Sequence, residues 1–459
     1  MSLLRPPQDT SAHIAGPRLA ILMLTLALTL IGLVMVYSAS APSAISEQAS
    51  AASYLKDQLV FAGLGIAAGF VFWRFVPYEL WRSPLFYAVW GVAVLMLVAV
   101  AVSGTVSLGA KRWLYIGSHS IQPSEFVKFV LVIGMARLLS RLRSGDIDMR
   151  KFAVRLVLGL LVPLLFLYRT QSDLGTTAII AAGIIGVLWL GEVPWKVIAA
   201  TVVVGALLVV ASIVTTQYRS GRMLYLDPWN DGEGGRGAGY QIIHSYYAFS
   251  QGGLFGSGLG NSREKFLYLP ESETDFIFAV IGEEFGLLGC LIVIGLFLGL
   301  LWAGLQVARH APDDFASMVA GSLTMMLVAQ AFLNIGCVIG VFPTTGKPLP
   351  FISSGGSSLI SSFIMVGIIL SVSRASGETV YSKRRDNLRI VKTGGSAEAG
   401  GGRGGAALWD SVARSVDRGR ATWSGKRPSA SAALGGAGAR SGEGSVSPRR
   451  SRRSDRRGR

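Results

Sequence analysis

Asp275 is the residue best placed for chemistry, in the segment ESETDFIFAVIGEEFG, where a charged loop meets a long apolar run. A carboxylate at the edge of a membrane helix can act as a general base toward a sugar hydroxyl. The structural alternative is that Asp275 only caps the helix that follows it. Glu283 lies eight residues further on, roughly 12 Å deeper along a helix. Glu283 and Glu284 are expected to pair with basic groups inside the protein.

Two other pairs of polar residues adjoin apolar runs. Ionisable side chains are costly there, so they mark candidate sites. Glu125 and Lys128 are three residues apart, so they share one helix face. They predict either a structural ion pair or the polar wall of an outward-facing cavity. Gln171 and Asp173 begin another apolar run on the same side, where Asp173 is either a helix cap or a second member of that wall.

Basic residues near these groups could hold a pyrophosphate or could anchor to lipid phosphates, and both interpretations stay open. They are Lys111, Arg112, Arg219, Arg222 and Lys265. The run GGLFGSGLG resembles a phosphate-binding glycine loop, but no strand precedes it, so it predicts a tight turn. The scattered histidines and the two cysteines, Cys290 and Cys337, have no metal-ligand spacing, so no metal site is predicted.

The elements that position these residues are membrane helices. Only 15% of the residues are charged and 51% are hydrophobic, which excludes an ordinary soluble enzyme. The sequence predicts an all-α polytopic protein with about ten transmembrane helices. The predicted spans are 19–37, 57–76, 85–103, 122–140, 152–168, 176–191, 196–214, 276–307, 315–341 and 356–373.

The loops between these spans predict the orientation. Those on the side of the N-terminus hold 12 Lys and Arg, against five in the short loops opposite. The positive-inside rule therefore places both termini in the cytoplasm, and the 61-residue loop 215–275 outside. A short amphipathic helix within that loop is expected to lie at the membrane surface.

The predicted organisation has three parts: a cytoplasmic segment at 1–18, a membrane domain at 19–374 and a disordered tail at 375–459. The tail carries 19 Lys and Arg against 7 Asp and Glu, or +12 of the total net charge of +16. Since this basicity lies outside any folded surface, no nucleic-acid partner is expected. The tail is expected to be dispensable for chemistry.

Six motifs together resemble the shape, elongation, division and sporulation (SEDS) family of FtsW, RodA and SpoVE. They are GAKRWLYIG, IQPSEFVKF, QSDLGT, YRSGRMLYLDPW, the segment from GYQIIHSYYAFSQ to GEEFG, and FPTTGKPLPFISSGGSS. The chain departs from the family pattern at Ser172, Thr345 and Ser354, with Lys347 two positions after Thr345. The roles of the 342–358 loop are therefore left open.

The resemblance implies a peptidoglycan glycosyltransferase that links lipid II units into glycan strands outside the plasma membrane. The essential aspartate of the family's TDF motif falls on Asp275. Within the family, the loop motif and the tail favour the division member, which acts at the septum. The family also implies a class B penicillin-binding protein and other division proteins as partners. Gln241, Lys347 and Ser357 join the candidate substrate-binding residues because they lie in these motifs.

The sequence leaves three questions open. A divalent cation, Mg²⁺ or Mn²⁺, is allowed but not required. A flippase of lipid-linked precursors is the main alternative function, a scaffold that recruits an enzyme is another, and within the family a RodA-type elongation polymerase is the alternative to the division role. The small and polar residues Gly321, Gln330, Asn334 and Gly336 of the ninth span predict close packing, either against a partner's helix or within the bundle.

Overall fold

The computed structural model describes residues 12–46, 50–107, 110–116, 119–214, 226–237 and 239–395. The chain divides into two compact units, Met1–Asn387 and Leu388–Arg459, and everything below concerns the first unit. Three sequence-based expectations lie outside the described residues: the first eleven residues, most of the basic tail, and the 215–225 segment that carries Arg219 and Arg222.

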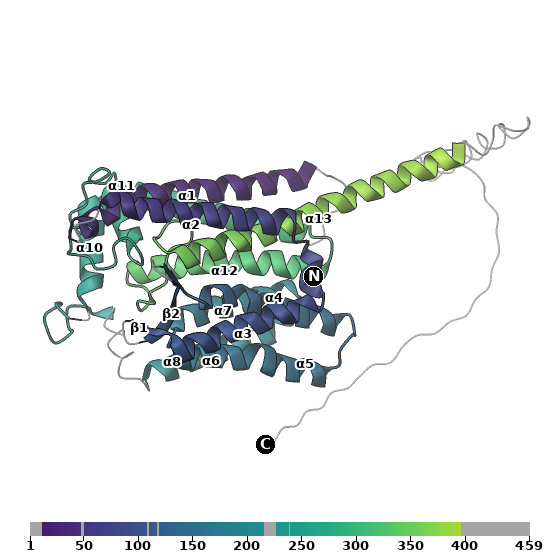
Figure 1. Ribbon diagram of the computed structural model, residues 1–459, viewed down its shortest axis with the longest axis horizontal. Helices are drawn as coiled ribbons and strands as arrows, with labels where there is room; N and C mark the ends of the chain where they lie inside the picture. The colour runs from purple at the N-terminus through teal and green to yellow at the C-terminus, as the bar shows by residue number, and fades with distance from the viewer. Residues whose placement is uncertain are drawn as a thin grey trace, which may run out of the picture. The chain divides into compact units, whose positions relative to one another are not determined.

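Helices dominate the fold (Figure 1). The first half of the chain forms α1 (Ala12–Ser46), α2 (Ala51–Arg74), the 3₁₀ helix η1 (Tyr78–Arg82), α3 (Leu85–Ser103), α4 (Ser124–Arg143), α5 (Met149–Leu156), the π-helical turn η2 (Val157–Leu161), α6 (Val162–Gln171) and α7 (Leu174–Leu190). The second half forms α8 (Trp195–Val214), α10 (Tyr240–Gly252), α11 (Ile277–Arg309), α12 (Asp314–Val338) and α13 (Gly356–Gly395).

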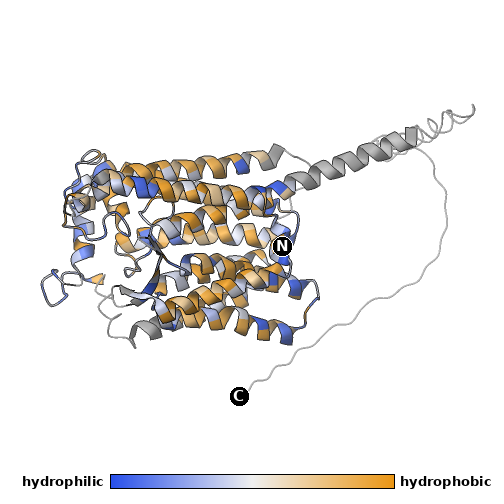
Figure 2. Cartoon of the chain, in the orientation of Figure 1, coloured by the Kyte–Doolittle hydropathy of each residue, from blue (hydrophilic) through white to orange (hydrophobic). Residues whose placement is uncertain are grey.

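The helices confirm a polytopic membrane fold. Among the described residues, seven helices are long and apolar enough to cross a bilayer, and two shorter apolar helices cover Leu174–Leu190 and Trp195–Leu207. Helix α4 overlaps another predicted span but carries several charged residues. The count of ten spans therefore stays a prediction. Apolar residues cover the middle of the bundle and hydrophilic residues gather at its two ends (Figure 2).

The predicted break between the fifth and sixth spans is present, and its local chemistry is clear. Ser172 ends α6 in the left-handed conformation, with φ of 48°. Asp173 then caps α7 by accepting a hydrogen bond from the Thr176 amide at 2.9 Å. The chain thus turns within two residues, and this turn carries Gln171 and Asp173 into the interior.

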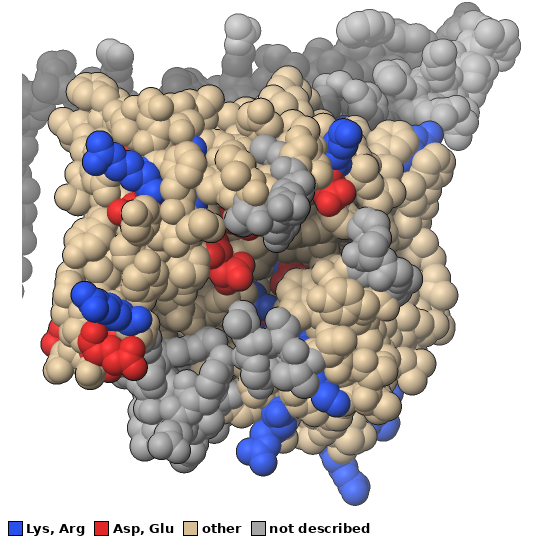
Figure 3. Space-filling view, turned by 60° about the vertical axis from the view of Figure 1, so that its left-hand side comes forward, with Lys and Arg blue, Asp and Glu red and all other residues tan. Residues whose placement is uncertain are grey.

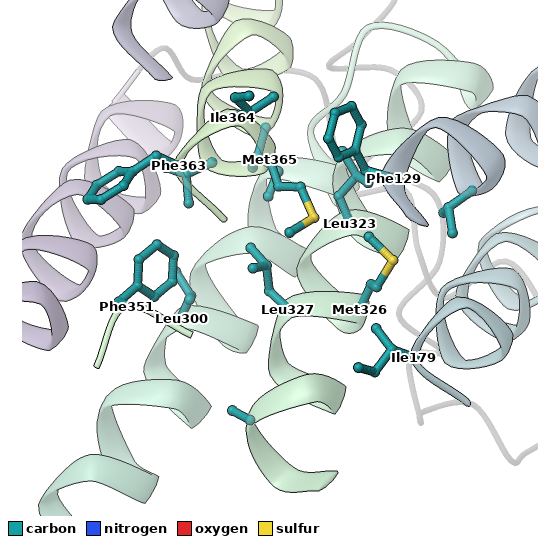
Figure 4. Packing of buried hydrophobic residues seen from close by; sticks show 14 of the residues in the cluster. Phe129, Ile179, Leu300, Leu323, Met326, Leu327, Phe351, Phe363, Ile364 and Met365 are labelled. Carbon is teal, nitrogen blue, oxygen red and sulfur yellow. The ribbon is translucent and has the colours of Figure 1, made fainter. Parts of the chain in front are cut away.

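Helix α12 forms the centre of the packing. Its Leu323, Met326 and Leu327 are fully buried. Figure 4 shows these side chains between Phe129 and Ile179 on one side and Phe351 and Phe363 on the other. The bundle therefore closes around α12.

The small and polar residues of α12 pack within the bundle rather than against a partner's helix. A side chain at Gly321 would meet Leu190, and one at Gly336 would meet Phe342. Gln330 and Asn334 are buried and hydrogen-bonded to other parts of this chain. Of the two alternatives that the sequence left open for these four residues, the structure supports the intramolecular one.

One end of the bundle carries a small antiparallel sheet and helix α10 (Figure 1). The sheet has the order β1 (Thr105–Ser107), β2 (Ala110–Ile116) and β3 (His119–Ile121), and pairs Leu114 with Ile121. The hydropathy pattern predicts only a loop over 104–121, although Trp113 and Tyr115 are residue types that favour strands. The predicted helix in the long loop is confirmed as α10.

Candidate active site

A polar pocket of about 210 Å³ lies where the segments that precede α11 and follow α12 meet. Figure 3 shows this end of the molecule hollowed, with acidic and basic side chains inside the hollow. The pocket is lined by Arg112, Gln241, Glu271, Asp275, Phe276, Asn334, Cys337, Thr344, Thr345, Gly346 and Lys347. It therefore collects residues from β2, α10, α12 and the two loops on either side of α11 and α12.

Asp275 lies in the wall of this pocket, immediately before α11. The N-cap position of α11 is occupied by Phe276, which makes no capping side-chain hydrogen bond. Asp275 therefore lies one residue before the N-cap position that the alternative interpretation assigned to it. Its backbone carbonyl accepts a hydrogen bond from the Asn334 amide at 2.7 Å, which ties this segment to α12.

The 342–355 loop passes close to the Asp275 carboxylate. A Cβ atom at Gly346 would lie 3.3 Å from Asp275 Oδ2, and Gly346 has a φ of 67°, which a glycine adopts without strain. Asn334 also donates to the Lys347 carbonyl at 2.8 Å. One amide thus fixes both walls of the pocket, and its oxygen, Oδ1, is buried without a hydrogen-bond partner among the described residues.

Two glutamates adjoin Asp275 in the sequence, but only one reaches the pocket. Glu271 lines it and accepts a hydrogen bond from the Thr274 hydroxyl at 2.5 Å. Glu273 instead turns toward α1, where it meets the hydroxyl of Ser43 at 3.5 Å. Burial, followed by the repulsion from Glu271, raises the pKa of the Glu273 carboxyl above its ordinary value. Glu271 is therefore the second pocket carboxylate.

A buried ionic network forms the floor behind the pocket. Lys347 Nζ lies 2.7 Å from Asp173 Oδ2 and 3.9 Å from Glu125 Oε1. Lys128 Nζ lies 2.6 Å from both Glu125 Oε2 and Gln330 Oε1. The four charged side chains are almost completely buried. Two lysines and two carboxylates balance one another, as burial in a bundle requires.

The sequence allowed either structural ion pairs and caps or a polar cavity wall for these residues, and the network contains both. Glu125 and Lys128 form an ion pair, and that pair belongs to a polar wall shared with Asp173. Asp173 is both the cap of α7 and the partner of Lys347. Ser357 stabilises the wall by accepting a hydrogen bond from the Gln122 amide at 3.0 Å.

Arg112 joins the pocket to the turn between α6 and α7. Its guanidinium donates from Nε to the Gln171 carbonyl at 3.0 Å and from Nη2 to the Ser172 carbonyl at 3.1 Å. A guanidinium has five N–H donors, so this anchor uses only part of its capacity. The Gln171 side chain is fully buried, and neither of its polar atoms has a hydrogen-bond partner within the described part of the chain.

Lys265 lies in a second buried cluster, apart from the residues that line the pocket. Its Nζ contacts Glu284 Oε1 at 2.7 Å and the Ser38 hydroxyl at 2.9 Å. The expected pairing of Glu284 with a basic group is confirmed. The same expectation for Glu283 is wrong, because that carboxylate accepts hydrogen bonds from the Ser262 hydroxyl at 2.5 Å and the Arg263 backbone amide at 2.6 Å.

The pocket lining includes some of the substrate-binding residues predicted from the sequence, and it also includes residues that were not predicted. Gln241 lines it, whereas Lys111 lies on β2 and is not one of the lining residues. Thr344 and Thr345 belong to the pocket although their residue types carried no signal. Asn334 was singled out only for helix packing, and its position one turn after Gln330 on a polar stripe is the signal that could have indicated the site.

The pocket residues also fit a divalent cation. Mg²⁺ is usually held by one or two carboxylates together with substrate phosphates. Asp275 and Glu271 offer two carboxylates among the residues that line the pocket. No group of three His, Cys, Asp or Glu that could hold a metal occurs within the described ranges.

Comparison with known proteins shows which family the chain resembles. The model of the FtsW/RodA/SpoVE family, described as "Cell cycle protein", matches residues 18–378. The stage V sporulation protein E of Bacillus subtilis is 40% identical over 79% of this chain and 98% of its own length. The probable peptidoglycan glycosyltransferase FtsW of Geobacter metallireducens is 38% identical over 77% of this chain and 94% of its own.

Two solved structures have the same fold. One comes from a study titled "Structural coordination of polymerization and crosslinking by a peptidoglycan synthase complex", with a TM-score of 0.61 and 26% identity over 78% of this chain and 97% of that chain. The other is the rod shape determining protein RodA of Thermus thermophilus, with a TM-score of 0.56 and 26% identity over 77% of this chain and 95% of that chain.

Proposed function

Because the chain belongs to the FtsW/RodA/SpoVE family, we propose that it is a peptidoglycan glycosyltransferase that polymerises lipid II at the Asp275 pocket. The observation that carries the proposal is the lining of that pocket. It brings the carboxylate of the TDF motif together with Arg112 and Lys347 at a polar end of a membrane bundle. The names of relatives such as the probable glycosyltransferase of G. metallireducens support the reaction type.

Asp275 is the proposed general base. Its carboxylate takes the proton from the 4-hydroxyl of the acceptor GlcNAc as that oxygen bonds to the anomeric carbon of the donor MurNAc. The bond from the anomeric carbon to the pyrophosphate oxygen breaks, and undecaprenyl pyrophosphate leaves with the electron pair. Asn334 positions the base by donating a hydrogen bond to the Asp275 carbonyl.

Arg112 is the proposed cation for the leaving group. Its guanidinium is held by two carbonyls and lines the pocket, so its remaining donors are pre-oriented toward a pyrophosphate. Lys347 is neutralised by Asp173, and we assign it to positioning the loop that faces Asp275. A divalent cation, when bound by Asp275 and Glu271, would supply further charge neutralisation for the phosphates.

Lys265, Glu283 and Glu284 hold the segment 253–270 in place through their buried contacts, and we assign them a supporting role without contact to the substrate. Arg219 and Arg222 lie outside the described residues and stay candidates for phosphate binding.

The proposed setting is the plasma membrane at the division septum, with cytoplasmic termini and an outward-facing pocket. The basis for the division role is the loop motif and the several relatives named FtsW. We also propose a class B penicillin-binding protein as partner. The likeness to a chain from a study of polymerization and crosslinking by a synthase complex supports that assignment.

A purified-protein assay tests the reaction. The main rival is a flippase of lipid-linked precursors, which the buried charges Glu125, Lys128, Asp173 and Lys347 favour because transporters carry such groups within their spans. The protein is reconstituted in vesicles with fluorescent lipid II and no second enzyme. We expect glycan polymer. Transport of lipid II across the vesicle membrane without polymer would support the flippase and overturn the proposal.

A further inference from the structure

The turn at residues 252–260, GGLFGSGLG, presents large apolar side chains to the outside although it belongs to no membrane span. Leu254, Phe255 and Leu259 are 62%, 78% and 54% exposed. The neighbouring Phe266 is also more than half exposed, and Lys265 joins it to this turn by donating to the Gly260 carbonyl at 2.8 Å. We call Leu254, Phe255, Leu259 and Phe266 the apolar turn surface. A surface of this kind in a loop marks an interaction site.

The turn is fastened to α11 at the one place where that helix is interrupted. Gly286 has a φ of 66° and breaks the helical conformation within α11. The carbonyls of Glu283 and Glu284 accept from the amides of Ser257 and Gly258 at 2.9 and 3.0 Å. In the other direction, the amides of Leu287 and Leu288 donate to the carbonyls of Gly253 and Leu254 at 2.9 and 3.2 Å.

This pairing satisfies the backbone polar groups that the break in α11 would otherwise leave open. Non-helical backbone is tolerated at membrane depth only where its polar groups are satisfied by the protein. Three neighbouring charged side chains are buried: Lys265, Glu283 and Glu284 are at most 3% exposed and are hydrogen-bonded within the protein. These three charges therefore face inward, whereas the large apolar side chains of the turn and the charged Arg263 that follows it are exposed.

The position of the turn along α11 coincides with a membrane boundary. From Phe285 to Ala308 the helix has no charged residue, and Arg309 follows it. A span of about 20 residues measured back from Arg309 ends near Gly289. The turn is level with residues 283–288, so it lies at the other boundary of the bilayer. Its apolar surface continues the exposed apolar face of α11, which includes Leu287, Leu288 and Leu291.

We propose that the 252–260 turn is an interfacial membrane anchor, in which Leu254 and Phe255 insert into the boundary between headgroups and acyl chains. The occupant of the apolar turn surface is thus the lipid bilayer. The apolar turn surface is continuous with the exposed apolar side of α11, and GGLFGSGLG contains no charged residue. Helix α10, which is expected from its sequence to lie at the membrane surface, directly precedes this turn.

Depth-dependent fluorescence quenching tests this inference independently of any reaction. Single cysteines replace Phe255, Leu291 or Glu233 in full-length protein that carries Cys290→Ala and Cys337→Ala. Each variant is labelled with an environment-sensitive fluorophore and reconstituted in vesicles with or without lipids that carry a quencher in the acyl chain. Leu291 on the exposed side of α11 is the membrane control, and Glu233 in the exposed 226–237 segment is the aqueous control.

We expect the label at Phe255→Cys to show a blue-shifted emission and quenching comparable with those at Leu291→Cys. Leu254→Cys provides a second, independent position on the same turn. Emission and quenching at both turn positions like those at Glu233→Cys would overturn the proposal, and the apolar turn surface would then be assigned to a protein partner. Because the purified protein is alone in the vesicles, shielding by another protein cannot produce the expected result.

Discussion

At the scale of single residues, the pocket separates the groups that can meet a substrate from the groups that hold them. Asp275, Glu271 and Arg112 line it with incomplete burial, whereas Lys347 lines it with its ammonium already paired to Asp173. A buried lysine that has a carboxylate at 2.7 Å is neutralised locally. We therefore expect catalysis to depend on Asp275 and Arg112, and stability to depend on the pairing of Lys347 with Asp173.

Lys347→Met tests this division of roles. The substitution leaves Asp173 buried without its partner, which typically costs about 3–5 kcal/mol. The double variant Lys347→Met with Asp173→Asn removes both charges and should recover most of that loss. Thermal unfolding and lipid II polymerisation are measured on the same preparations.

We expect activity to recover together with stability in the double variant. Recovery of stability without recovery of activity would show that the lysine charge acts on the substrate. Lys151, which is exposed and pairs only with Asp148 at 3.8 Å, gives the matched control, because Lys151→Met should change neither quantity.

The sequence alone identified most of these residues, but not their partners. Asp275, Asp173, Glu125 and Lys128 stand out because charge beside an apolar run is rare. Their grouping depends on contacts such as Lys347 to Asp173, which are 174 residues apart and have no local signal. Asn334 was overlooked as a site residue because a neutral amide on a helix is typical of ordinary packing as well.

At the scale of elements, the segment before α10 is held by one carboxylate. Asp231 accepts hydrogen bonds from the backbone amides of Glu233, Gly235 and Gly237 at 2.8–2.9 Å, and from Gly239 at 3.3 Å. These bonds, with that from Gly235 the largest contribution, lower the pKa of Asp231 to about 2. This segment leads into α10, which supplies Gln241 to the pocket.

Asp231→Asn is expected to loosen this segment, because a neutral amide oxygen is a weaker acceptor and its nitrogen cannot accept. Hydrogen exchange at the amides of Gly235 and Gly237 should become faster.

The same carboxylate makes the stability of the segment depend on pH. The pKa of Asp231 is lowered on folding, so its contribution to stability is complete above the unfolded pKa of about 3.9 and is lost as the pH falls toward about 2. Glu233→Gln, an exposed neighbour, is the control, and equal exchange in both variants would refute the assignment.

The secondary structure was predicted correctly where a hydropathy pattern was long and was missed where the element was short. The apolar runs and the break at QSDLGTT gave helices and a turn at the predicted places. The strands β1 to β3 are three to seven residues long, and their pairing is set by contacts across turns rather than by periodicity. The break at Gly286 lies inside one apolar run, and only the backbone partners from the 252–260 turn explain it.

At the scale of the whole molecule, the pocket and the basic loop between α4 and α5 lie at opposite ends of the bundle (Figure 1). The sheet and α10 occupy the same end as the pocket. The basic residues Arg141, Arg143, Arg150, Lys151 and Arg155 lie around that second loop. The positive-inside rule then predicts that the pocket faces outward.

Labelling of single cysteines tests this orientation. Ser144→Cys and Glu233→Cys are both at exposed positions and avoid the glycines of positive φ beside them. In intact cells that express Cys290→Ala and Cys337→Ala protein, an impermeant thiol reagent should label residue 233, and residue 144 only after permeabilisation. The reverse pattern would invert the topology and place the pocket in the cytoplasm.

The most direct test of the account is lipid II polymerisation by purified Asp275→Asn protein, measured together with its thermal stability. As Phe276 and not Asp275 occupies the N-cap position of α11, and the amide is isosteric with the carboxylate, the fold should stay nearly intact. Loss of a positioned base should lower the rate by about 10²–10⁴. Glu271→Gln changes the other pocket carboxylate and should retain most of the activity. Polymerisation at the wild-type rate by a stable Asp275→Asn protein would contradict the assignment of Asp275 as the general base.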